Sequence, residues 1–141
     1  MVLGLDGQRP AGLDEGALDD LARRAVDLER IGDFDLRVFT APSLDFRGAG
    51  GLRYAVSLDD AAPVIANLHE GETKTGEGQK SWEKAVADNA RVQTIRLTAA
   101  KAGAHRIRLW RVDPGVVFER LVISRGDLPD SYLGPVEGVR R

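Results

Sequence analysis

Several residue types are scarce or missing in this chain, and each absence excludes a class of protein. The sequence has no Cys, so it has neither a disulfide framework nor a thiolate zinc site. Its only His residues are His69 and His105, which excludes a zinc site built from three histidines. It also has no run of about 20 apolar residues, so no membrane-spanning helix is predicted.

A basic excess is missing as well. Lys and Arg total 20 against 22 Asp and Glu, a net charge of −2, whereas a nucleic-acid-binding domain is normally basic. Residues 1–10 lack the basic start and apolar stretch of a signal peptide, so an export signal, if the protein uses one, is expected outside this chain.

What the chain does contain is typical of one soluble domain rich in turns. It has 141 residues, 43% of them hydrophobic, and 16 Gly against 6 Pro. Many Gly residues indicate many turns, and many turns indicate short strands.

Apolar and polar residues alternate with period two in several segments, which is the pattern of half-buried strands. The segments are 34–38, 52–58, 91–98, 105–112 and 116–123, with turn residues between them. Ser81 could cap one short helix at about 80–89, whose apolar face carries Trp82 and Ala85. The sequence thus predicts an all-β, jelly-roll-like antiparallel β-sandwich with one short helix. Its predicted core is Phe34, Leu36, Val38, Leu52, Tyr54, Val56, Ile95, Leu97, Ile107, Leu109, Leu121 and Ile123.

Two segments have weaker patterns. Helix propensity favours a short helix near 14–22 followed by a strand near 23–30, although alternation over 24–28 also fits a strand alone. The polar stretch 69–80 is predicted to be a mobile loop.

No constellation with catalytic geometry is evident. Glycoside hydrolysis needs two carboxyl groups across a cleft, but the candidate aspartates lie beside turns or in the last turn of the predicted helix, where local hydrogen bonding favours Asp. These are Asp45, Asp59, Asp60, Asp88 and Asp113. Neither His has a nucleophile motif near it. We expect no catalytic residue, no metal and no cofactor; Asp45 and Asp113 could ligate a structural calcium, but no dedicated calcium loop is present.

Three segments resemble a known family in both order and spacing. They are APSLDF (41–46) with GLRYAVSLDD (51–60), SWEKAVADN (81–89), and LWRVDPGVV (109–117) closed by SYLGP (131–135). Together they resemble the C-terminal domain of glycoside hydrolase family 115, the xylan α-1,2-glucuronidases, over about residues 32–137. Residues 1–31 match poorly, and Val136 to Gly138 depart from the usual ending of the family. We therefore expect an atypical N-terminal segment, 1–31, in the same domain as a sandwich over 32–141.

The resemblance implies a galactose-binding-domain-like sandwich related to carbohydrate-binding modules. It does not imply glucuronidase activity, because the large catalytic portion of the family is absent from this chain. An extracellular or periplasmic location is expected from the family.

One face of the predicted sheet suggests a ligand site. If Ile107 and Leu109 face the core, alternation places Arg106, Arg108 and Trp110 on the other face, and Arg96 joins them if the two strands are adjacent. A ring can stack on a sugar and a guanidinium can bind a uronate carboxylate. The alternative is that Trp110 packs under a loop or another domain and the arginines are solvated.

Three functions remain open at this stage. The first is a non-catalytic accessory module of a xylan-degrading hydrolase that binds acidic, glucuronic-acid-bearing xylan. The second is a structural or dimerisation domain that positions a catalytic partner, and the low aromatic content of 6% favours it. The third, a free-standing enzyme, has least support. The expected partners are a polysaccharide or a catalytic domain, not nucleic acid or a membrane. A homo-oligomer could form through the segment 1–31.

Overall fold

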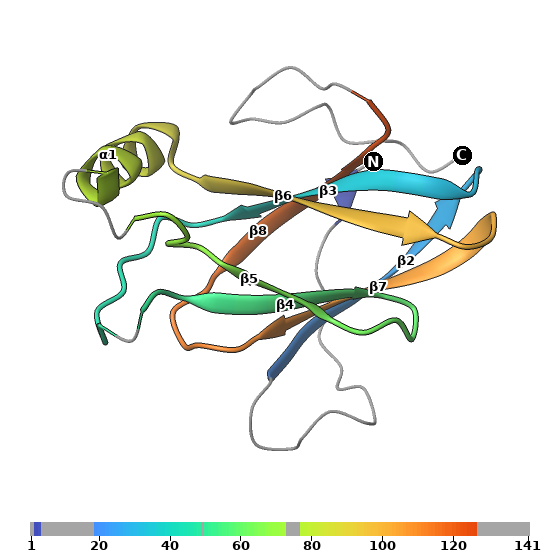
Figure 1. Cartoon of the computed structure of the whole chain (residues 1–141), viewed down its shortest axis with the longest axis horizontal. Helices are drawn as coiled ribbons and strands as arrows, with labels where there is room; N and C mark the ends of the chain where they lie inside the picture. The colour runs from blue at the N-terminus through green and yellow to red at the C-terminus, as the bar shows by residue number, and fades with distance from the viewer. Residues whose placement is uncertain (1, 4–18, 49, 73–76, 127–141) are drawn as a thin grey trace.

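The computed structural model describes residues 2–3, 19–48, 50–72 and 77–126, which form two antiparallel four-stranded sheets and one helix (Figure 1). Sheet A has the order β1 (Val2–Leu3), β8 (Phe118–Ser124), β3 (Gly32–Thr40) and β6 (Arg91–Ala99). Sheet B has the order β2 (Asp19–Leu28), β7 (Gly103–Arg111), β4 (Arg53–Leu58) and β5 (Val64–Asn67). The helix is α1 (Glu77–Asp88). The prediction of an all-β sandwich with one short helix is confirmed.

Alternating apolar side chains form the core between the two sheets. In β3, Phe34, Leu36 and Val38 are all 2% exposed or less, while the residues between them are partly exposed. The predicted core is confirmed: eleven of its twelve residues are buried, and the twelfth, Ile123, is partly buried and packs against them. Burial of this apolar surface is the main favourable contribution to folding.

The helix predicted near 14–22 is wrong where the structure describes it, because residues 19–22 belong to β2. This strand pairs with β7 from Asp19 to Leu28, so hydrogen bonding within the sheet overrides the helix propensity of the segment. The strand predicted near 23–30 is confirmed in part. Residues 14–18 lie outside the described residues.

A helix at about 80–89 was predicted and is present, but the prediction that Ser81 caps its first turn is wrong. The helix begins at Glu77, so Ser81 lies inside it and uses its hydroxyl for a tertiary contact with Glu72. The mobile loop predicted over 69–80 is wrong for residues 77–80, which are helical; residues 73–76 lie outside the described residues.

The end of α1 directs the chain straight into β6. Asn89 has a φ of 53°, and the amides of Asn89 and Ala90 donate to the carbonyls of Val86 (3.2 Å) and Ala85 (3.0 Å). This is the hydrogen-bond pattern of a Schellman cap, in which Asn tolerates the left-handed conformation. Because of this cap, β6 begins at Arg91, only three residues after the end of the helix at Asp88.

Candidate functional site

The four arginine and tryptophan residues predicted to form one surface do not do so. Arg106, Arg108 and Trp110 lie on β7 in sheet B, whereas Arg96 lies on β6, the edge strand of sheet A. The prediction assumed that consecutive strands pair, but the short connection from β6 to β7 crosses from one sheet to the other. Arg96 instead binds Asp35 across sheet A, with its Nε 3.0 Å from Oδ1.

Trp110 is not an open platform for a sugar. Its side chain is only 2% exposed, although it is not part of the main core cluster that contains Ile107 and Leu109. Its neighbour Ala55 on β4 is fully buried as well, so this part of the outer face of sheet B is covered. The prediction of an exposed Trp110 is therefore wrong, and burial of the ring matches the alternative reading.

The turn aspartates accept hydrogen bonds, in one case from a residue far away in the sequence. Asp113 accepts hydrogen bonds from the backbone nitrogen (2.8 Å) and Nε (2.8 Å) of Arg53, and Asp45 accepts one from the amide of Gly51 (2.7 Å). The hydrogen bonds from Arg53, helped by its charge, lower the pKa of Asp113 even though burial opposes the shift. No group of three His, Asp or Glu residues suited to a metal ion occurs in the part of the chain that the structure describes.

The buried side chain of His105 is paired with Asp59, which is partly exposed. Nδ1 of His105 lies 2.7 Å from Oδ2 of Asp59, and Nε2 lies 2.7 Å from the carbonyl oxygen of Lys101. Because both ring nitrogens face acceptors, the doubly protonated imidazolium fits best. The Asp59 contact, followed by the Lys101 carbonyl, raises the pKa of His105. Burial raises the pKa of Asp59, but its hydrogen bonds with His105 and the Arg106 amide outweigh burial and lower it overall.

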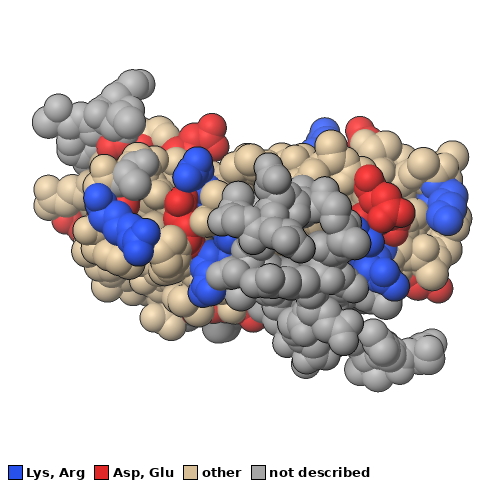
Figure 2. Space-filling view, turned by 90° about the horizontal axis from the view of Figure 1, so that it is seen from below, with Lys and Arg blue, Asp and Glu red and all other residues tan. Residues whose placement is uncertain are grey.

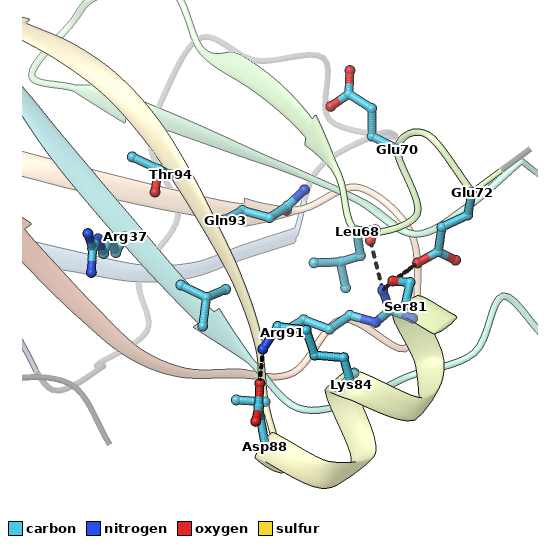
Figure 3. Close-up of a pocket in the computed structure, with 13 residues that line it drawn as sticks. Arg37, Leu68, Glu70, Glu72, Ser81, Lys84, Asp88, Arg91, Gln93 and Thr94 are labelled. Atoms are coloured by element: carbon cyan, nitrogen blue, oxygen red, sulfur yellow. Dashed lines mark hydrogen bonds and ion pairs between the residues drawn. The ribbon is translucent and has the colours of Figure 1, made fainter. Parts of the chain in front are cut away.

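A groove of about 700 Å³ lies between α1, the turn at 68–72 and the edge of β6 (Figure 3). The consecutive residues 91–94 of β6 all line the groove, and their side chains alternate between the two faces of the sheet. The groove therefore lies along the edge of this strand, which is the last strand of sheet A. The lining residues are Arg37, Leu68, Glu70, Glu72, Ser81, Lys84, Ala85, Asp88, Ala90, Arg91, Val92, Gln93 and Thr94.

A polar network holds α1 to the sandwich at this groove. Nη1 of Arg91 donates to Oε1 of Glu72 (2.6 Å), to Oγ of Ser81 (2.9 Å) and to the carbonyl of Leu68 (3.3 Å). Ser81 also donates to Glu72, whose second oxygen lies 2.7 Å from Nδ1 of His69. Burial raises the pKa of Glu72, but hydrogen bonds from Ser81, His69 and Arg91 together outweigh it and lower the pKa.

Ser81, Glu72 and His69 are the residue types of a hydrolase triad, but their hydrogen bonds do not follow the order that a triad needs. In a triad, the serine bonds to histidine Nε2, which takes its proton. Here Ser81 bonds to the carboxylate, and Nε2 of His69 has no partner among the described residues. The network therefore cannot activate the serine as a nucleophile.

Sequence reasoning missed this network because it treated residues 69–80 as a loop. A usable signal was present in β6, where positions 91, 93, 95, 97 and 99 share the inward face. Ile95, Leu97 and Ala99 are apolar, but Arg91 and Gln93 are polar. Polar residues at inward positions of a strand indicate either a buried network or a ligand site.

Three exposed apolar side chains lie on two loops that are joined to each other. Leu44 is 54%, Phe46 70% and Val117 53% exposed, and we call these three residues the loop cluster. The two loops are joined by the hydrogen bond from the Ala41 amide to the carbonyl of Val117 (2.9 Å). Phe46 also packs over Gly115, where an added Cβ would lie 3.0 Å from its ring.

The described charged side chains do not gather into a patch of one sign on the face shown in Figure 2. On the described part of the face in Figure 2, Lys and Arg side chains lie beside Asp and Glu rather than forming one basic area. No described helix is long and apolar enough to cross a lipid bilayer.

Comparisons with known proteins identify the domain. The family model of the glycosyl hydrolase family 115 C-terminal domain matches residues 25–137, which begins inside the segment expected to match poorly. No curated protein gives a significant match. Among solved structures, one similar chain is a family GH115 4-O-methyl-α-glucuronidase with specificity for decorated arabinogalactans, with 20% identity and a TM-score of 0.65. The similarity covers 79% of this chain and 14% of that protein, so this chain spans a small part of it. Since the family model covers most of the chain, the protein belongs to the family of glycosyl hydrolase family 115 C-terminal domains.

Proposed function

We propose that this domain is a non-catalytic accessory module that packs against the catalytic part of a family-115 glycoside hydrolase through the loop cluster. The observation that carries the proposal is the group of exposed apolar side chains at Leu44, Phe46 and Val117. Exposed apolar groups on neighbouring loops are typical of interaction sites. We expect the domain to act outside the cytoplasm, as its family relationship suggests.

The choice of partner rests on the relative size of the matching protein. This chain corresponds to 14% of the solved glucuronidase, so the same kind of domain there belongs to a much larger protein. The three residues of the loop cluster are between 53% and 70% exposed, and covering them would contribute on the order of 1 kcal/mol per residue. That is enough to position a domain but not to make an independent high-affinity complex.

A non-catalytic role is supported by what the carboxylates do. Asp45, Asp59 and Asp113 each accept hydrogen bonds from nearby backbone amides, and Asp60 and Asp88 pair with Arg108 and Lys84. Carboxylates that hold turns and strand ends are not free to act as an acid and a nucleophile across a cleft.

Photo-crosslinking tests the proposed contact. A benzoylphenylalanine at position 46, introduced into the protein in its source cells, should crosslink to the catalytic part of a family-115 hydrolase, whether on the same or a separate polypeptide. The matched control is position 65, where Ile65 is 63% exposed on the edge strand β5. Crosslinks to other proteins only, or equal yields at positions 46 and 65, would contradict the proposal.

Self-pairing through the same cluster is the second structural function. It predicts that the isolated chain is a dimer by light scattering and that Phe46→Ser makes it a monomer, because the loop cluster would be shared between two copies. A monomer at high concentration, or a dimer unaffected by Phe46→Ser, would contradict pairing through this surface.

A further inference from the structure

The outer face of sheet A carries apolar side chains that are buried. On β8, Leu121 belongs to the core between the sheets, so the next residue, Val122, faces the opposite side. On β3, Val38 and Phe39 are related in the same way. Val122 is 0% and Phe39 1% exposed, and the two form a separate cluster with Ala90. The outer face of an antiparallel sheet is normally solvated, so burial this complete requires a cover.

No described helix or strand supplies this cover. The helix α1 lies at one end of sheet A in Figure 1, and the strands of sheet B lie on its inner side. Arg120 lies 4.4 Å from the centre of the Phe39 ring and covers part of the cluster. The structure contains one chain, so the rest of the cover has to come from this chain as well. The two long stretches beyond the described residues, 4–18 and 127–141, are the candidates.

Residues 4–18 are the weaker candidate, because the two ends of this stretch lie in different sheets. Leu3 pairs with β8 in sheet A, whereas Asp19 begins β2 in sheet B. The stretch therefore has to leave sheet A. Residues 127–141 instead follow directly after β8, the strand that carries Val122.

The spacing along the chain brings one motif of the C-terminal stretch to the level of the cluster. Gly126 lies four positions after Val122 and has a φ of 100°, a conformation that suits a reversal of the chain. A chain that turns back here and runs along β8 regains the level of Val122 after about five residues, since the rise per residue is similar on both paths. The next two residues are Tyr132 and Leu133, the apolar pair of the SYLGP motif.

The charges of the two partners are complementary. On the outer face, Val122 lies opposite Arg37, and Phe39 lies opposite Arg120, so the cluster has basic neighbours. The segment DLPD at 127–130 carries two Asp. Opposite charges on two docking surfaces favour their association and fix the register.

The cover is narrow. On the same face, Val92 of β6 lies opposite Phe39 but is 44% exposed. The cover therefore spans β8 and β3 and ends before β6. Two strands have a width of about 10 Å, which suits one segment of chain better than a second domain or a second copy of the protein.

We propose that the outer face of sheet A is the docking surface of the protein's own C-terminal segment, with the SYLGP motif packed on Val122 and Phe39. The family model includes this segment, because its match extends to residue 137. Docking of the segment closes this face of the sandwich to other partners. The docking surface shares no residue with the loop cluster, so failure of either proposal leaves the other intact.

Nuclear Overhauser effects in the full chain test the contact directly. The sequence has two Tyr residues, Tyr54 and Tyr132, so labelling of Tyr rings and Val methyls gives two ring signals, and Tyr132→Phe identifies one of them. The Tyr132 ring should contact the methyls of Val122 but not those of Val92. Absence of the Tyr132–Val122 contact would overturn the proposal. Contacts to Val122 from residues 4–18 instead, or only from a second copy in a mixed-label sample, would overturn it too.

Amide hydrogen exchange in full-length variants tests the energetic role of the motif. Tyr132→Ala should speed exchange in β8 and β3 at least tenfold, because it uncovers their outer face, and should leave β4 and β7 unchanged. Tyr132→Phe keeps the ring and should exchange like the native chain. The matched control, Val139→Ala, lies beyond the family match and should also exchange like the native chain. Equal effects of Tyr132→Ala and Val139→Ala, or uniform acceleration in all strands, would contradict docking on this face.

Discussion

At the scale of single residues, short polar side chains hold the turns of this domain and set its strand ends. Their local positions were readable from the sequence, since Asp beside Gly and Pro is typical of turns. Their partners were not, because Asp113 and Arg53 or Asp59 and His105 are separated by 60 and 46 positions. Such pairs depend on which strands become neighbours, and that is decided by packing of the whole domain.

The His105–Asp59 contact makes stability depend on pH. The pKa of His105 is raised in the folded protein, so its contribution is fully present below the ordinary value of 6.5 and is lost as pH rises through the folded value. The free energy of unfolding should therefore fall in that window for the native chain and stay flatter for His105→Gln. Urea denaturation from about pH 6 to about pH 9 measures this. Parallel curves for the two proteins would exclude the contact as a source of stability.

Substitutions at Gly51 and Gly103 allow the effect of backbone strain to be separated from the effect of a steric clash. Both Gly51 (φ 114°) and Gly103 (φ 107°) are left-handed, but a Cβ on Gly51 would lie 2.1 Å from Oδ1 of Asn67, whereas one on Gly103 would meet open space. Gly103→Ala should cost about 1–2 kcal/mol from strain alone. Gly51→Ala should cost roughly 1–3 kcal/mol more, because it also displaces the Asn67 hydrogen bonds to Gly50 and His69. Equal losses in thermal denaturation would show that Asn67 moves aside freely.

At the scale of elements, alternation predicted the strands well where one face is apolar. It identified β3, β4, β6, β7 and β8 because their inward residues are buried together between the sheets. For β2 the prediction was right only in the second half of the strand: residues 19–22 were assigned to a helix on propensity, whereas they form a strand that pairs with β7. It also could not assign strands to sheets, so β6 and β7 were wrongly taken as neighbours and the predicted Arg and Trp surface was wrong.

The core between β4 and β7 should respond strongly to truncation. Val56 and Leu109 lie opposite each other and are at most 1% exposed. Leu109→Ala should destabilise the protein by roughly 2–5 kcal/mol, and Val56→Ala by a smaller but clear amount, since each leaves a cavity. Val64→Ala on β5, where Val64 is 43% exposed, should change the unfolding free energy by less than about 1 kcal/mol. Losses at Val56 and Leu109 no larger than at Val64 would mean that these positions are not packed.

The helix α1 should depend on its contact with Arg91 and Glu72. Ser81→Ala removes the hydroxyl that joins both residues, so amide hydrogen exchange in α1 should become faster while exchange in β3 stays unchanged. Lys84→Ala is the matched control, because its ion pair with Asp88 lies within the helix and is exposed, and such pairs contribute about 0.3–0.5 kcal/mol. Equal effects of the two substitutions would show that Ser81 does not anchor the helix.

At the scale of the whole molecule, the family was recognisable from the sequence, but the position of a site was not. The resemblance to a family-115 C-terminal domain, drawn from the segments at 41–60, 81–89 and 109–117, is confirmed by the family model that matches residues 25–137. Two of them carry the loop cluster, since Leu44 and Phe46 lie in the first and Val117 closes the third. The two loops are joined by the hydrogen bond from Ala41 to Val117, a long-range contact that no local pattern predicts.

Direct binding to the catalytic part of a family-115 hydrolase is the measurement closest to the central claim. Isothermal titration of the native chain into the catalytic polypeptide identified by crosslinking should show saturable binding with a negative heat-capacity change, because apolar surface is buried. Phe46→Ser should weaken that binding about fivefold or more, and Ile65→Ser should leave it unchanged. Absence of binding, or equal affinity of the native chain and Phe46→Ser, would contradict an accessory domain that docks through its loop cluster.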